Sequence, residues 1–128
     1  AALRDANLRP SDLSYINAHA TATPAGDPVE VASLRNALGA AADDVPVSST
    51  KAQHGHMLGA ASAMELAVCV LAMKHGFLPA TAFLEDIDPA CPLRHVPGVA
   101  ERGVQIRHTL SLSAGFGGTN AALVLSKR

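Results

Sequence analysis

Three features of other protein classes are scarce in this sequence: excess basic charge, aromatic side chains and cysteine. Lys and Arg together number 10 against 11 Asp and Glu, a formal net charge of −1, which argues against a nucleic-acid binder with a basic face. Aromatic residues make up 3% and Trp is absent, so stacking on nucleobases is not expected. The two cysteines, Cys69 and Cys91, are too few for a disulfide scaffold and lack zinc-site spacing.

Long apolar runs are also missing. No stretch approaches the ~20 consecutive apolar residues of a membrane span, and the first residues lack the charged and apolar regions of a signal peptide. With 48% hydrophobic and 16% charged residues among 128, the chain has the composition of one folded domain rather than a disordered segment. We therefore expect a cytoplasmic domain that binds neither nucleic acid nor a membrane.

Two helices stand out in the pattern of the chain. One is expected to start at Asp27, a good N-cap, with Pro28 at the first helical position, Glu30 placed to complete a capping pair and Gly39 as the stop. The second covers 59–75 and is almost wholly apolar. A helix that is apolar all round must be covered on every side, so a partner chain or a missing part of the fold is expected to cover it.

The rest of the chain supplies mostly extended segments. The expected elements are the end of a helix over 1–7, strands over 14–18, 45–49, 105–113 and 121–125, and an irregular Pro-rich segment over 77–97. The resulting order is helix, strand, helix, strand, helix, strand, strand. This order predicts an α/β fold with a mixed sheet.

Three loops follow expected strand ends and carry residues suited to chemistry. They hold His19, Thr21 and Thr23 in the first, Lys51, His54 and His56 in the second, and a glycine-rich turn around Phe116 in the third. Ligands of open α/β sheets collect at the carboxyl ends of the strands, so we expect the loops to converge on one pocket. Two histidines there could hydrogen-bond a developing oxyanion, or one could act as a base, and the backbone N–H groups of 115–118 could add to an oxyanion hole.

Each of these signals has a structural alternative. A lone loop histidine such as His19 more often serves the fold, and the glycines could simply connect two strands. The histidines lack an acidic or cysteine partner at helical spacing, which makes a metal site the weaker interpretation. Glu65 is harder to explain structurally, because a carboxylate in an apolar helix is costly to bury unless it is paired; a functional or network role is favoured.

Taken together and in this order, the loops resemble the β-ketoacyl-[acyl carrier protein] synthases of fatty acid synthesis. The segments that carry the resemblance are Asn17-Ala18-His19-Ala20-Thr21-Ala22-Thr23-Pro24, then Ser48-Ser49-Thr50-Lys51 with Gly55-His56-x-x-Gly59-Ala60-Ala61, and finally Gly115-Phe116-Gly117-Gly118-Thr119-Asn120-Ala121. They are similar to the family's first-histidine motif, its lysine and second-histidine motif, and its C-terminal signature. The segment around Asp88-Pro89 also resembles the family and makes Cys91 structural.

The resemblance implies a thiolase-like layered αβαβα fold, α/β in class, of which residues 1–128 would form the C-terminal half. The apolar helix over 59–75 would then be one of two helices buried at the centre. The family's nucleophilic cysteine lies in the N-terminal half, and neither Cys69 nor Cys91 lies in a nucleophile motif. The chain by itself is therefore expected not to catalyse condensation.

The implied reaction is a decarboxylating Claisen condensation. A cysteine takes an acyl chain from its carrier protein; malonyl-carrier then loses CO2, and the resulting carbanion attacks the acyl thioester. By motif, His19 and His56 would hold the malonyl thioester carbonyl and stabilise the enolate. Lys51 and Glu65 would belong to the network that fixes the second histidine, and the pairing of two histidines indicates the elongating class.

The resemblance also implies roles for the third loop and for the ends of the first. Phe116 would gate the nucleophile, with its backbone N–H in the oxyanion hole and Gly115 and Gly117 beside the substrate. Thr21 and Thr23 would contact the phosphopantetheine arm. The expected partners are the acyl carrier protein and a second copy in a homodimer. No cofactor is expected, since phosphopantetheine is carried by the acyl carrier protein.

Some positions depart from the family's usual residues, and other assignments stay open. The departures are Ala20 for Gly, Ala22 for Ser, His54 for a common Thr, and Ser113-Ala114 for Ser-Phe. A non-catalytic partner resembling a chain-length factor is the main alternative, although it would not need the retained His19, Lys51 and His56. A coenzyme A-dependent thiolase shares the fold, but its motifs are absent. The sequence does not separate fatty acid from polyketide synthesis.

Overall fold

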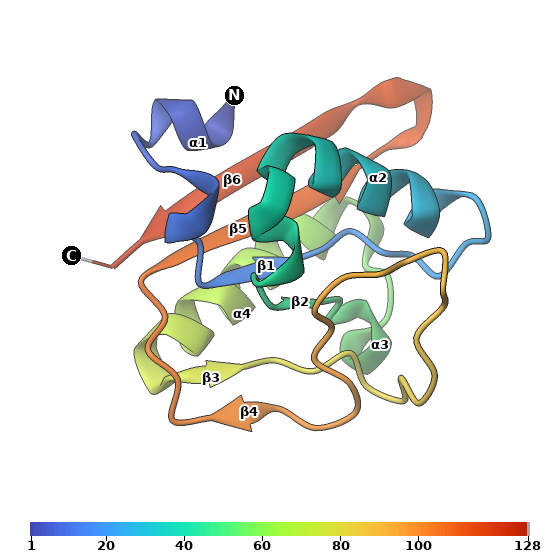
Figure 1. Cartoon of the computed structure of the whole chain (residues 1–128). Coiled ribbons are helices and arrows are strands. Elements are labelled where there is room, and N and C mark those ends of the chain that lie inside the picture. Colours follow the sequence, from blue (N-terminus) through green and yellow to red (C-terminus); the bar gives the residue numbers. More distant parts are fainter. Residues whose placement is uncertain (128) are drawn as a thin grey trace.

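The computed structural model describes residues 1–127 (Figure 1). Its helices are α1 (Ala2–Asp5), α2 (Gly26–Leu38), α3 (Lys51–His54) and α4 (Ala61–His75). Its strands are β1 (Tyr15–Asn17), β2 (Val47–Ser48), β3 (Phe77–Leu78), β4 (Glu101–Arg102), β5 (His108–Ala114) and β6 (Asn120–Ser126). Short 3-10 turns cover Pro10–Asp12, Gly39–Asp43, Leu58–Ala60 and Phe116–Gly118.

A mixed four-stranded sheet in the order β2-β1-β5-β6 forms the centre. β1 runs parallel to both β2 and β5, and β5 pairs with β6 as an antiparallel hairpin. Asn17 at the end of β1 lies beside Ser48 at the end of β2. The two loops that follow these strands therefore leave the sheet at the same edge, which is how a parallel pair brings distant sequence segments together.

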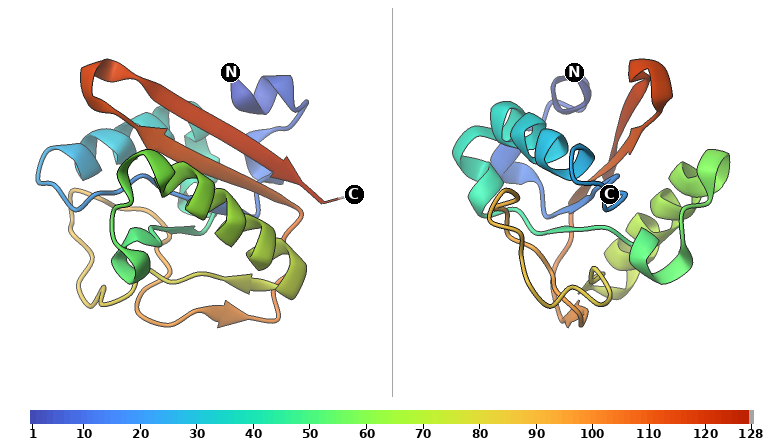
Figure 2. Two further views of the ribbon diagram at one scale, coloured as in Figure 1. Left: turned by 180° about the vertical axis from the view of Figure 1, so that it is seen from behind. Right: turned by 90° about the vertical axis from the view of Figure 1, so that its right-hand side faces the viewer.

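The two faces of the sheet are covered by different helices: α2 lies on one face and α4 on the other (Figure 2). β1 shows this alternation directly, because Ile16 packs in the core that includes Leu34 of α2, while Tyr15 packs in the core that includes Cys69 of α4. Side chains of successive strand residues point to opposite faces. A helix-covered sheet of this kind matches the α/β architecture expected from the sequence.

The outer face of α4 is apolar and exposed in residues 1–127. Met64, Val70 and Leu71 are 37%, 51% and 47% exposed, while the inner face buries Glu65 and Cys69 against the sheet side. By length and composition alone, the segment Leu58–His75 could span a membrane, and 28% of it is buried within the described residues. One such helix is weak evidence, because the core helix of a soluble protein passes the same test. The sequence predicts that this helix is covered on every side, and the exposed face with Met64, Val70 and Leu71 is the part that residues 1–127 leave uncovered.

The structure corrects several sequence-based boundaries. α2 begins at Gly26 rather than after an Asp27 cap, and the hydroxyl of Thr23 accepts the Gly26 N–H at 3.0 Å. α4 starts at Ala61, after a 3-10 turn, rather than at residue 59. The expected strand over 105–113 starts at His108 and the one over 121–125 extends to 120–126. The pairing of β3 with β4 was not predicted, because it joins segments more than twenty residues apart that show no local strand pattern.

Candidate functional site

The structure brings the two motif histidines together. His19 lies two residues after the end of β1, and His56 follows β2 through the short helix α3. Their ring centroids lie 5.7 Å apart in an edge-to-face arrangement with an interplanar angle of 85°. Two imidazoles from separate loops at one sheet edge can therefore both hydrogen-bond to a single small group placed between them.

The tautomer of His56 follows from its backbone partner. The N–H of Leu58 donates to Nδ1 of His56 at 3.1 Å. A ring nitrogen that accepts a hydrogen bond carries no proton, so in the neutral imidazole the proton lies on Nε2. Nε2–H is then the donor that His56 offers to a ligand.

Lys51 and Glu65 form a buried ion pair beside the histidines. Nζ of Lys51 donates to Oε1 of Glu65, and the two side chains are 5% and 0% exposed. A buried charge is tolerated only when it is paired, which explains the carboxylate inside an apolar helix. The pair joins the first residue of α3 to α4, the two helices on either side of the turn that carries His56.

Burial keeps His19 neutral. The pKa of His19 lies below its usual 6.5, first because burial disfavours the imidazolium and second because the Lys51 ammonium is close, while Glu30 and Glu65 oppose the shift in part. A neutral imidazole retains one donor and one acceptor nitrogen. The Lys51 ammonium that contributes to this shift is itself paired with Glu65.

We expect His19 to titrate at a lower pH than an ordinary histidine. Because its pKa is lowered on folding, the unfolded chain binds more protons between that lowered value and 6.5. The stability contribution of this group is therefore complete above 6.5 and is lost as the pH falls from 6.5 through the lowered pKa. NMR of the ring protons, with the His19 signal identified from a His19→Ala variant, measures the pKa. A midpoint at or above 6.5 would show that burial does not control this histidine.

Glu30 holds the His19 loop, a role that the sequence analysis missed. Its carboxylate accepts the backbone N–H of His19 and of Ala20, each at 2.8 Å, and Ser49 donates its hydroxyl to the Ala20 carbonyl at 3.1 Å. The expected capping pair at the start of α2 is wrong, since the helix end has no such side-chain cap. No local signal distinguishes a capping glutamate from one that binds a loop eleven residues upstream.

The same loop contains an alanine in a left-handed backbone conformation. Ala22 has φ of 60°, a region that costs an L-residue with a Cβ roughly 1–2 kcal/mol. We expect Ala22→Gly to raise the free energy of unfolding by about 1 kcal/mol, because glycine enters this region without that cost. The control Ala32→Gly, on the exposed side of α2, should lower it by about 1 kcal/mol. Denaturant unfolding measures both, and a loss of stability in both variants would contradict the prediction.

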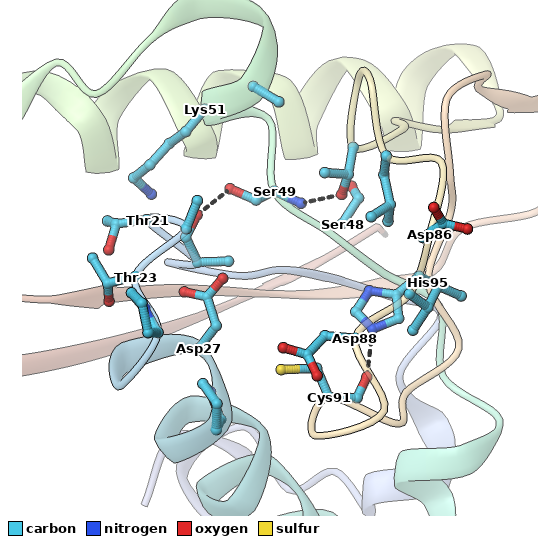
Figure 3. A pocket seen from close by; sticks show the side chains of 18 of the residues that line it. Thr21, Thr23, Asp27, Ser48, Ser49, Lys51, Asp86, Asp88, Cys91 and His95 are labelled. Carbon is cyan, nitrogen blue, oxygen red and sulfur yellow. Dashed lines mark hydrogen bonds between the residues drawn. The ribbon is translucent and has the colours of Figure 1, made fainter.

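A cavity of about 620 Å³ opens beside the histidine loops. Figure 3 shows Thr21, Thr23 and Lys51 on one side of it and Asp88, Cys91 and His95, from the segment after β3, on the other. His56 also lines this cavity, whereas His19 lines a neighbouring cavity of about 420 Å³ bounded by α2 and the β5–β6 hairpin. Within residues 1–127, no cluster of three or more His, Cys, Asp or Glu side chains is arranged to hold a metal ion.

The third loop does not join the histidines as the sequence analysis expected. Phe116 lies at the tip of the β5–β6 hairpin and is fully exposed, and neither it nor Gly115 and Gly117 lines the cavities beside the histidines. The hairpin closes on itself, with the Gly115 N–H donating to the Thr119 carbonyl at 2.7 Å. Strand residues just before and after this turn do line the cavity that contains His19: Leu112, Ser113 and Ala114 of β5, and Asn120, Ala121 and Ala122 of β6.

Neither cysteine has the environment of an activated nucleophile. Burial raises the pKa of the Cys69 thiol to about 11, and burial together with Asp88 and Asp27 raises that of Cys91. Reactive cysteines show the opposite shift, since the thiolate is the nucleophile. Both side chains are buried as free thiols.

Comparison with known proteins assigns the family. Residues 1–85 match the family model described as "Beta-ketoacyl synthase, C-terminal domain", and the chain belongs to this family. It is 48% identical over 125 residues to the 3-oxoacyl-[acyl-carrier-protein] synthase 2 of Coxiella burnetii, covering 98% of this chain and 30% of that protein. It is 47% identical over 127 residues to the tetracenomycin polyketide synthase ketoacyl synthase alpha subunit of Streptomyces glaucescens, covering 99% and 30%.

Solved structures show the same relationship. The ishigamide ketosynthase/chain length factor superposes with a TM-score of 0.93 at 36% identity, covering 98% of this chain and 30% of that one. A β-ketoacyl synthase from Burkholderia phymatum STM815 superposes with a TM-score of 0.91 at 35% identity, covering 99% and 30%. The fold is therefore the thiolase-like fold of ketosynthases. The chain spans about 30% of the length of the relatives that it matches.

Proposed function

We propose that the protein carrying this chain is an elongating β-ketoacyl-[acyl carrier protein] synthase, an acyltransferase that catalyses decarboxylative Claisen condensation. The observation that carries the proposal is the pair of rings of His19 and His56, which two separate motif loops bring to 5.7 Å. Relatives at 48% and 47% identity bear the names of a 3-oxoacyl-[acyl-carrier-protein] synthase and of a polyketide synthase ketoacyl synthase subunit. The identity of the acyl substrate would distinguish fatty acid synthesis from polyketide synthesis.

In this proposal the histidines act on the malonyl thioester carbonyl. His56 donates from Nε2–H, and neutral His19 donates from one ring nitrogen to the same oxygen. When the bond between the α-carbon and the carboxylate breaks, CO2 leaves and the electron pair passes to the thioester oxygen as an enolate. Hydrogen-bond donors aimed at a developing oxyanion lower the barrier of such a step. The α-carbon then attacks the acyl thioester, and the nucleophile's sulfur leaves as a thiolate.

The remaining motif residues support this step. The buried Lys51–Glu65 pair holds α3 against α4 and so fixes the turn with His56. Thr21 and Thr23, at the mouth of the larger cavity, contact the phosphopantetheine arm. Phe116, with Gly115 and Gly117, serves as the gate and oxyanion contact for the acyl thioester. The exposure of Phe116 is consistent with a gate that packs against another part of the complete protein.

The nucleophilic cysteine is proposed to lie outside this chain, in the N-terminal half of the thiolase-like fold. The chain spans about 30% of its relatives, and its own two thiols have raised pKa values. The same N-terminal half is proposed to cover the exposed apolar face of α4 around Val70 and Leu71. Residues 1–128 alone would then be inactive.

The proposed partners are the acyl carrier protein and a second copy of the enzyme, in the cytoplasm. One structural neighbour, AntDE:AntF, is described as a type II acyl-carrier protein in complex with its ketosynthase; it has a TM-score of 0.94 at 32% identity and covers 99% of this chain and 31% of that one. A non-catalytic partner like a chain-length factor remains the second candidate. It is disfavoured because His19, Lys51 and His56 are all present, with the rings of His19 and His56 side by side and Lys51 paired with Glu65.

The experiment that tests the proposal is a condensation assay. The full-length protein is incubated with malonyl-carrier protein and an acyl-carrier protein, and the carrier-bound product is identified by mass spectrometry. A 3-oxoacyl product two carbons longer than the acyl substrate is expected. Failure to form it, with the carriers shown to be loaded and the protein folded, would favour the non-catalytic partner.

A further inference from the structure

His54 lies at the centre of a chain of hydrogen bonds that joins the two histidine loops. At one end, Nδ2 of Asn17 lies 3.2 Å from Oγ1 of Thr50. Oγ1 of Thr50 lies 3.2 Å from Nε2 of His54, and Nδ1 of His54 lies 2.8 Å from the carbonyl oxygen of Gly55. Asn17 is two residues before His19, and Gly55 directly precedes His56.

The chemistry of the partners fixes the direction of every bond. The Gly55 carbonyl can only accept, so Nδ1 of His54 carries the proton. In the neutral ring Nε2 is then an acceptor, and the Thr50 hydroxyl donates to it. The Thr50 oxygen is thereby free to accept from the Asn17 amide, which can only donate through Nδ2. Each member donates once toward Gly55, and no two donors face each other.

The last bond acts directly on the backbone of His56. The Gly55 carbonyl belongs to the peptide group between Gly55 and His56, so a donor on that oxygen fixes the plane from which the His56 side chain projects. The N–H of Gly55 is held by the Lys51 carbonyl at 2.8 Å. Gly55 itself has φ of 75°, and a glycine backbone is free to adopt other conformations. The hydrogen bonds to its N–H and to its carbonyl hold it in this one.

We propose that His54 is a positioning residue, which sets the orientation of His56 relative to His19 through Thr50 and the Gly55 carbonyl. The inference rests on the proposed function, because its effect is read through the step that His56 serves. His54 is half-buried, makes no contact with the ion pair of Lys51 and Glu65 in the hydrogen bonds of residues 1–127, and is not proposed to touch substrate. A misplaced catalytic group costs rate without removing the group itself.

The test separates the two bonds of His54 with half-mimics. In His54→Asn the amide nitrogen takes the place of Nδ1 and keeps the bond to Gly55, whereas in His54→Gln the amide oxygen takes the place of Nε2 and keeps only the bond to Thr50. His54→Ala loses both. Each is made in the full-length protein, with His75→Ala, at the opposite end of α4, as the control and His56→Ala as the reference. Release of CO2 from malonyl-carrier gives kcat and KM, and acylation of the nucleophile is followed by intact mass.

We expect His54→Ala to lower kcat for CO2 release on the order of 10- to 100-fold, as a displacement of about 1 Å does, with KM and the acylation rate within about twofold of wild type. His54→Asn should recover most of the rate and His54→Gln less. If the His54→Ala variant does not fold, the comparison of CO2 release between His54→Asn and His54→Gln still tests the inference. Wild-type CO2 release in all three His54 variants, or an equal loss in all three, overturns the inference, provided that His56→Ala shows its expected loss of CO2 release. Wild-type release in His56→Ala instead overturns the proposed function.

Discussion

Replacing His19 or His56 by Ala in the full-length protein is expected to lower the release of CO2 from malonyl-carrier about 10²- to 10³-fold. The reason is geometric: the two rings lie 5.7 Å apart, and each would supply one of the two hydrogen bonds to the thioester oxygen that becomes the enolate. Loss of one such donor typically costs 10²–10³ in rate. Acyl transfer to the cysteine, which needs neither bond, should be largely intact.

Radiolabelled malonyl-carrier measures the first step, and intact-mass analysis of the acylated protein measures the second. His75→Ala is the control, since His75 lies at the far end of α4 from the site. A normal rate of CO2 release in both histidine variants would exclude the assignment. A parallel loss of acyl transfer would instead show that the histidines maintain the nucleophile's side of the site.

Breaking the buried pair of Lys51 and Glu65 should have the largest effect on stability. With side chains 5% and 0% exposed, removing one partner leaves the other charge buried without compensation, which costs about 3–5 kcal/mol. We expect Lys51→Met and Glu65→Leu each to lower the free energy of unfolding by that amount. The double variant should recover much of the loss, because apolar residues of similar volume replace both charges.

Denaturant unfolding of the full-length variants measures these differences. Glu101→Gln is the matched control: Glu101 pairs with Arg94 at 3.5 Å, but both side chains are close to half exposed, and such surface pairs contribute about 0–1 kcal/mol. Single variants as stable as this control would mean that the interior charges are solvated or paired elsewhere. A double variant with a lower free energy of unfolding than either single variant would show that the ion pair stabilises the fold more than apolar residues in the same place do.

The elements that the sequence predicted well are those with a local signal. The glycine stop after Leu38 and the almost wholly apolar stretch over 59–75 placed α2 and α4 within a few residues, and the two extended segments around the glycine-rich turn placed β5 and β6. These features act within a turn or two of the chain, so they are visible in the sequence. The pairing of β3 with β4 is a long-range contact, and nothing in the residues of either strand specifies it.

The candidate site divides in the same way. Motif order placed His19, Lys51, His56 and Glu65, and the structure brings them to one edge of the sheet because β1 and β2 are parallel neighbours. The clamp from Glu30 to the His19 loop was missed, since a glutamate in the first turns of a helix has a simpler local explanation as a cap. Phe116 was expected to share one pocket with the histidines, yet in residues 1–127 it is fully exposed and lines neither of the cavities beside them.

The most direct test of the site is a crystal structure of the full-length protein with a non-decarboxylating malonyl-thioester analogue. The proposal predicts that the thioester oxygen lies about 2.7–3.1 Å from one ring nitrogen of His19 and from Nε2 of His56. The phosphopantetheine arm should then pass Thr21 and Thr23. A thioester oxygen bound elsewhere, with the two rings still 5.7 Å apart, would contradict the central claim that this histidine pair holds the carbonyl.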